Sequence, residues 1–163
     1  MTGSTLMLST LHRGERHLAR QLRTVAERHG AEHEIHYIAM DLARWSEEHV
    51  QVLADTAQGH GLELTHSGGA TPVNRAPVHP DGGTPTLNEH LVPALVLLRD
   101  LRELHLGAVE NSLHWEMLAQ AAQALKDDEL LALVTTCHPR TLRQMRWTNT
   151  MIKNMAPQIL SNV

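Results

Sequence analysis

Five ionisable side chains of types that bind transition metals are candidates for one site: Glu15, His49, Glu110, His114 and His138. Two carboxylates with three imidazoles suit Fe, Mn or Zn better than Ca or Mg. Glu110 and His114 are four residues apart, so both could reach the same ion from one helical face. An open coordination position on a bound Fe or Mn ion would permit oxygen or peroxide chemistry.

The same side chains also have a metal-free interpretation. The two carboxylates could accept hydrogen bonds from the three histidines, which would satisfy a buried charge without an ion. His12 or Glu48 could replace a member of the set, because apolar periodicity defines the rotation of a helix only to within about one residue. Cys137 and His138 resemble a nucleophile and its base in composition alone, so they do not indicate covalent catalysis.

Apolar residues at helical spacing predict four helices, which must position these side chains. The predicted helices cover residues 4–29, 31–58, 86–125 and 127–155. Glu15 and His49 fall on the apolar stripes of the first two helices, and Gly30 between these helices predicts an antiparallel hairpin. Pro139 predicts a kink or interruption of the last helix, and Pro157 predicts its end.

The two later helices carry the other three candidates on their predicted inner faces. Glu110 and His114 lie away from an outer face that contains Glu116. His138 lies on the same side of the last helix as Leu142. All five candidates are near the middle of their hairpins, so they are expected to converge at one level of the interior.

Residues 59–86 differ in composition from the rest, being rich in Gly, Pro, Thr and His without a sustained period. A stretched chain of this length reaches roughly 90 Å, enough to run back along a helix of about 40 Å. The sequence therefore predicts an all-α four-helix bundle in which two antiparallel hairpins are joined by a long crossover loop. This topology is ferritin-like, and its sites are built from inward-pointing side chains. Residues 1–163 are expected to form this single domain.

Charge and hydropathy indicate a soluble, cytoplasmic protein. Lys and Arg number 14 against 18 Asp and Glu, a net charge of -4, which argues against nucleic-acid binding through the phosphate backbone. No apolar run approaches the roughly 20 residues of a membrane span, and no signal peptide is recognised. The single cysteine, Cys137, cannot form an intramolecular disulfide, which fits a reducing compartment.

The segment LRELHLGAVENSLHWEMLAQAAQALKDDELLALV, residues 101–134, resembles the third helix and following turn of the YciE/YciF-type ferritin-like bacterial proteins. Its Ala-Val-Glu-Asn run at 108–111 matches the family's Ala-Val-Glu-His run, and Glu15 matches the glutamate of the family's first helix. The resemblance implies the ferritin-like bundle and a link to stress responses. The family commonly has a carboxylate-rich last helix, whereas this chain has Thr-Cys-His-Pro-Arg-Thr, so the resemblance implies a changed or lost metal centre.

Three functions fit the sequence. The first is transition-metal binding through a divergent Glu/His site, in metal handling or a stress response. The second is a non-catalytic bundle that acts by oligomerisation, expected as a dimer, or by partner binding, with residues 91–106 as an apolar surface. The third is a metal-dependent thiol transferase with a DinB-type bundle, which is disfavoured because its His-x-x-x-His pair, His29 and His33, straddles the turn at Gly30. A basic stripe on the last helix is explained by a solvated surface or by acidic residues of a neighbouring chain: Arg140, Arg143 and Arg146.

Overall fold

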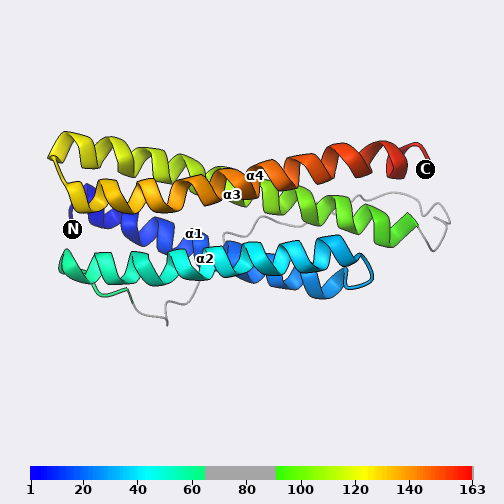
Figure 1. The fold of residues 1–163 in the computed structure, drawn as a ribbon, viewed down its shortest axis with the longest axis horizontal. Coiled ribbons are helices and arrows are strands. Elements are labelled where there is room, and N and C mark those ends of the chain that lie inside the picture. The colour runs from blue at the N-terminus through cyan, green and yellow to red at the C-terminus, as the bar shows by residue number, and fades with distance from the viewer. Residues whose placement is uncertain (65–90, 163) are drawn as a thin grey trace, which may run out of the picture.

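The computed structural model of the chain describes residues 1–64 and 91–162, and these residues form four helices and no β-strand. The helices are α1 (Gly3–Arg28), α2 (His33–Gly59), α3 (Leu91–Leu125) and α4 (Asp128–Leu160) (Figure 1). The predicted all-α four-helix bundle is therefore confirmed. Most of the predicted crossover, from residue 65 onward, lies outside the described residues. None of the described helices combines the length and apolar character needed to span a membrane.

The helices pack as two hairpins, α1 with α2 and α3 with α4, that are joined mainly through α1 and α3. Arg28 of α1 pairs with Asp100 of α3, and Gly14 of α1 lies against Asn111 of α3. Residue numbers therefore rise along one helix as they fall along the other, so α1 and α3 are antiparallel. It follows that α2 and α3 are parallel, which is the arrangement that a long crossover produces.

Polar side chains define the helix ends. Thr2 caps α1 through a reciprocal pair of bonds with Thr5, in which the Thr5 backbone N–H donates to Thr2 Oγ1 at 3.3 Å. Asp127 caps α4 by accepting from the backbone N–H of Leu130 at 3.0 Å. The other oxygen of Asp127 lies 3.0 Å from His60 Nε2, which ties the end of α2 to the turn between α3 and α4.

The two prolines of α4 do not end or interrupt the helix, so the predicted end at Pro157 and the predicted interruption at Pro139 are wrong, whereas the kink that was the alternative at Pro139 stays a prediction. The helix is continuous from Asp128 to Leu160, with Pro139 and Pro157 inside it. Each proline removes a single backbone donor, and both side chains are exposed, so neither ring disturbs the core. Buried residues on both sides of Pro139 hold the helix against its neighbours, and this packing outweighs the lost hydrogen bond.

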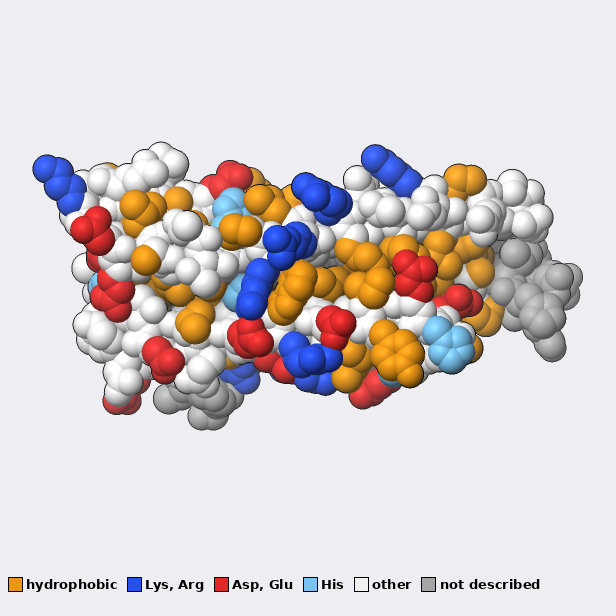
Figure 2. Space-filling model, in the orientation of Figure 1, with side chains coloured by type: hydrophobic (Ala, Val, Ile, Leu, Met, Phe, Trp, Pro, Cys, Tyr) orange, Lys and Arg blue, Asp and Glu red, His pale blue; other side chains and the backbone are white. Residues whose placement is uncertain are grey.

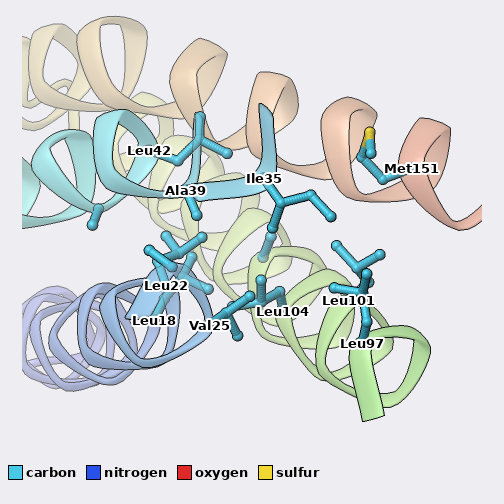
Figure 3. Close-up of a cluster of buried hydrophobic side chains, with 13 residues drawn as sticks. Leu18, Leu22, Val25, Ile35, Ala39, Leu42, Leu97, Leu101, Leu104 and Met151 are labelled. Atoms are coloured by element: carbon cyan, nitrogen blue, oxygen red, sulfur yellow. The ribbon is translucent and has the colours of Figure 1, made fainter. Parts of the chain in front are cut away.

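The apolar core consists of two clusters that occupy opposite halves of the bundle. One cluster is built around side chains such as Leu22, Ala39 and Leu104 (Figure 3). The other is built around Leu11, Leu53 and Leu118. Between the clusters, each of the four helices contributes buried polar side chains, which we call the polar layer: Glu15, Ser46, His49, Asn111, Ser112, Thr141 and Gln144.

The close approach of α1 and α3 beside the polar layer depends on Gly14. This dependence predicts how a substitution at Gly14 changes stability. A Cβ at Gly14 would lie 2.2 Å from Oδ1 of the buried Asn111, whereas a Cβ at Gly107 would meet nothing nearer than 3.5 Å. We expect Gly14→Ala to lower the free energy of unfolding by about 1–3 kcal/mol, because the clash exceeds the gain in helix propensity. The matched control Gly107→Ala should leave stability unchanged or raise it by up to about 1 kcal/mol. Urea unfolding followed by circular dichroism measures both, and a Gly14→Ala protein as stable as wild type would contradict the close packing.

Candidate functional site

Glu15 is the centre of the polar layer. Its carboxylate is fully buried, and Oε1 accepts a hydrogen bond of 3.1 Å from the indole Nε1–H of Trp115 on α3. Nδ1 of His49 on α2 lies 3.2 Å from the same oxygen, within ion-pair distance but without the alignment of a hydrogen bond. The second oxygen, Oε2, is buried and has no hydrogen-bond partner among the described residues. Side chains from three helices thus meet at one buried carboxylate.

His49 is buried to the same degree and is held by Trp115. The two rings meet edge to face, with centroids 5.9 Å apart and planes at 79°. Nε2 of His49 is buried and lacks a hydrogen-bond partner among the described residues. An ionised carboxylate in an apolar interior is costly unless a cation or donors compensate it. The imidazole of His49 and the Trp115 indole are the polar groups that lie against the Glu15 carboxylate.

The negative charge of Glu15 also acts on α4. Burial and the nearby Glu15 carboxylate raise the pKa of the Cys137 thiol to about 12, against a smaller opposite effect of Arg140. Cys137 therefore remains a thiol at neutral pH and is a poor nucleophile. Its neighbour His138 has its pKa lowered by burial, and the charge of Glu116 opposes this shift only in part. Neutral His138 makes a 2.8 Å hydrogen bond with Ser112 Oγ instead of reaching a carboxylate.

The structure brings together two of the five predicted ligands, Glu15 and His49. Glu110 is exposed, and His114 and His138 are only partly buried. In residues 1–64 and 91–162 no group of three or more His, Cys, Asp or Glu side chains is arranged to hold a metal ion. The five side chains that the sequence placed at one interior level therefore do not converge there.

The difference has one physical cause, a rotation of α3 and α4 by about one residue relative to the predicted faces. Trp115, not His114, occupies the interior position of α3, and Cys137, not His138, occupies that of α4. A large indole and a thiol bury more favourably than imidazoles, so the apolar side chains determine the rotation. Of the two alternative ligands, His12 is buried, whereas Glu48 is 58% exposed and pairs with Arg140 on the surface.

Gln144 and Asp100 are among the interior polar side chains that the sequence reasoning missed. Gln144 of α4 donates through Nε2 to the Leu42 carbonyl oxygen at 3.0 Å and to Ser46 Oγ at 2.9 Å. Gln144 is seven residues after Cys137, a spacing that places both on one helical face and could have revealed it. These bonds are the buried polar link between α2 and α4.

Asp100, another residue that the sequence reasoning missed, joins the far end of α1 to α3. His29 Nε2 donates to Asp100 Oδ2 at 2.8 Å, and the Arg28 guanidinium donates to the same oxygen at 2.6 Å. Burial by itself would raise the pKa of Asp100, but the hydrogen bonds from His29, Arg28 and Arg99 together hold it below its ordinary value. Asp100 is consequently ionised at neutral pH, and it has a structural role at the end of the bundle.

The buried pair of Glu15 and His49 generates a stability prediction. We expect His49→Leu to cost about 3–5 kcal/mol of unfolding free energy, because it leaves the Glu15 carboxylate buried without its imidazole partner. The double variant Glu15→Leu/His49→Leu should recover most of this loss, since no unpaired charge remains. Glu110→Leu, an exposed control, should change stability by less than about 0.5 kcal/mol. Chemical denaturation measures all three, and equal stability of His49→Leu and wild type would show that the pair is not charged.

Comparison with known proteins finds no matching family model, no similar curated protein and no similar solved structure. The resemblance to the YciE/YciF-type proteins therefore stays a prediction. Of the two glutamates that carry it, Glu15 is buried in the polar layer, whereas Glu110 faces solvent.

Proposed function

We propose that the protein is a non-catalytic helical bundle that acts by self-association. The observation that carries this proposal is an apolar surface along the seam between α2 and α4. We call it the α2/α4 strip and define it by four partly exposed side chains that pack on the core: Ile38, Trp45, Trp147 and Met155. Figure 2 shows hydrophobic side chains gathered between α2 and α4 on this face.

The strip is accessible because α2 and α4 are the neighbouring helices that pack least closely. Gln144 reaches α2 in the polar layer, and Arg140 pairs with Glu48 and lies over the Trp45 ring, 5.7 Å from its centroid. Beyond these contacts, toward the C-terminal end of α4, large apolar side chains are left partly exposed. A contiguous apolar surface of this kind on a folded domain is typical of a protein–protein interface.

The interior supports the same function. Cys137 is held as a thiol, Glu15 is compensated by His49 and Trp115, and no third metal ligand joins them among the described residues. Buried polar contacts of this kind suit a role in fixing the alignment of helices, as a hypothesis for this bundle. A rigid, uniquely aligned bundle presents one fixed surface to a partner.

Self-association can be tested with one charge placed in the strip. We expect the wild-type chain to form dimers as its concentration rises, and Met155→Glu to weaken dimerisation by about 10- to 100-fold, because a carboxylate would be buried in an apolar interface. Leu160→Glu is the matched control: it adds the same charge to the same helix, at an exposed position rotated by about 140° from Met155. Sedimentation equilibrium measures the dissociation constants, and circular dichroism verifies that each variant is folded. A wild-type chain that stays monomeric, or a Met155→Glu protein that dimerises like wild type, refutes the proposal.

Transition-metal binding is the second candidate, and unpartnered atoms of the polar layer favour it. Glu15 Oε2, His49 Nε2 and Gln144 Oε1 are buried without hydrogen-bond partners among the described residues. A carboxylate and an imidazole fit Fe, Mn or Zn, and the amide oxygen is a weaker ligand for the same ions. In this version of the function, Glu15 and His49 would hold the ion, and the chain would act in metal handling or a stress response.

Metal analysis of protein purified without an affinity tag tests this candidate. If the site binds metal, we expect near-stoichiometric Fe, Mn or Zn in the wild type and its loss in His49→Gln, which removes one of the two strong ligands that the described residues offer. Glu110→Gln should retain the metal, because Glu110 is exposed. Protein that is metal-free, even after incubation with each ion under reducing conditions, excludes this candidate and leaves the association proposal intact.

A further inference from the structure

The two helices that border the α2/α4 strip carry opposite charges. On α2 the acidic residues Glu34, Asp41 and Glu48 recur every seven residues, and all three are exposed. A seven-residue repeat keeps side chains on nearly the same face of a helix. Arg140 of α4 contacts Glu48, so this acidic row borders the seam with α4.

The facing border, on α4, is basic. Arg140 lies at the seam, and Arg143, three residues later, is exposed on the adjoining face. Figure 2 shows the Lys and Arg side chains crossing the middle of this face, with acidic side chains along α2. The strip thus lies between an acidic border and a basic border, a pattern that a partner with the reverse order would complement.

A second copy of the chain has that reverse order when it is turned over about a twofold axis parallel to the bundle. Such a rotation leaves each residue at the same height along the bundle and exchanges the α2 side of the face with the α4 side. As a result, α4 of each copy lies over α2 of the other. The end of the face that carries the α2/α4 strip in one copy then meets the same end of the face in its partner. A twofold axis across the bundle would instead stack α4 on α4 and bring arginines together.

The dimensions of this face suit a stable dimer. The 27 residues of α2 make a helix of about 40 Å, and two helices side by side are about 20 Å wide. The whole face, including its polar half, therefore offers at most roughly 800 Å² per copy, the amount that one partner buries in a standard protein–protein interface.

We propose that two copies of this chain pack face to face through the α2/α4 strip about a twofold axis parallel to the bundle, with Arg143 of each copy opposite Asp41 of the other. Arg140 pairs with Glu48, and Arg143 is about 4.5 Å further along α4. In the same direction along α2, Asp41 is about 10.5 Å from Glu48. The remaining offset of about 6 Å is within the reach of an extended Arg side chain. The Asp41 carboxylate is 60% exposed and pairs only with the similarly exposed Arg44 of its own chain among the described residues, a weak contact that an intermolecular pair can replace. This inference rests on the proposed self-association and adds its geometry.

Two charge reversals test the arrangement by mixing. In Arg143→Glu homodimers both contacts become Glu opposite Asp, and in Asp41→Arg homodimers both become Arg opposite Arg. We expect each variant alone to dimerise at least about tenfold more weakly than wild type. In an equimolar mixture both contacts of the heterodimer pair opposite charges, so dimerisation should return to the wild-type level. Native mass spectrometry should then show the heterodimer as the main dimeric species.

Arg20→Glu makes the same charge change on the exposed surface of α1 and is the control, which should dimerise like wild type. The arrangement is wrong if a single variant dimerises as tightly as wild type, or if the mixture does not regain wild-type dimerisation. The proposed function still stands in either case, provided that the wild-type chain dimerises. A wild-type chain that is monomeric at every concentration overturns the proposed function itself, and this inference with it.

Discussion

A carboxylate buried without access to water is the constraint around which this bundle is organised. Burying the Glu15 side chain is costly unless polar groups from other helices reach it, and His49 and Trp115 do so from α2 and α3. A slip of either helix by one turn would remove a partner from a buried charge. The cost of such a slip makes a single alignment of the three helices strongly preferred, which uniform apolar packing alone would specify less sharply.

The polar layer also divides the core into parts with different roles, one in stability and one in helix alignment. The apolar clusters on either side supply the burial that stabilises the fold, and the layer between them supplies alignment. On α4 the layer continues through Gln144, whose amide reaches the backbone of Leu42 and the hydroxyl of Ser46. All four helices therefore contribute buried polar side chains at the same level, and the polar contacts to Glu15 come from α2 and α3.

The helices were predictable from the sequence because each carries an apolar repeat, and Glu15 and His49 were predictable because they interrupt such repeats. The inner faces of α3 and α4 were not. Around Glu110 and His114 apolar residues occur on nearly every side, so periodicity leaves the rotation open, and it is decided by which side chain buries best, here Trp115. The continuity of α4 through Pro139 was unpredictable for a related reason, since it depends on packing from other helices and not on local propensity.

Side-chain size explains why α1 and α3 pack closely whereas α2 and α4 do not. The seam between α1 and α3 carries Gly14, where a Cβ would clash with Asn111, so the absence of a side chain there allows the two backbones to approach closely. The seam between α2 and α4 carries Trp45 and Trp147, and interaxial distance grows with the side chains at the contact. These indoles are partly exposed and belong to the apolar surface of this face. Moving α2 inward would have to displace them into solvent, whereas covering them with a second chain leaves the Glu15 alignment undisturbed. An exposed apolar surface therefore follows from the way the interior is packed.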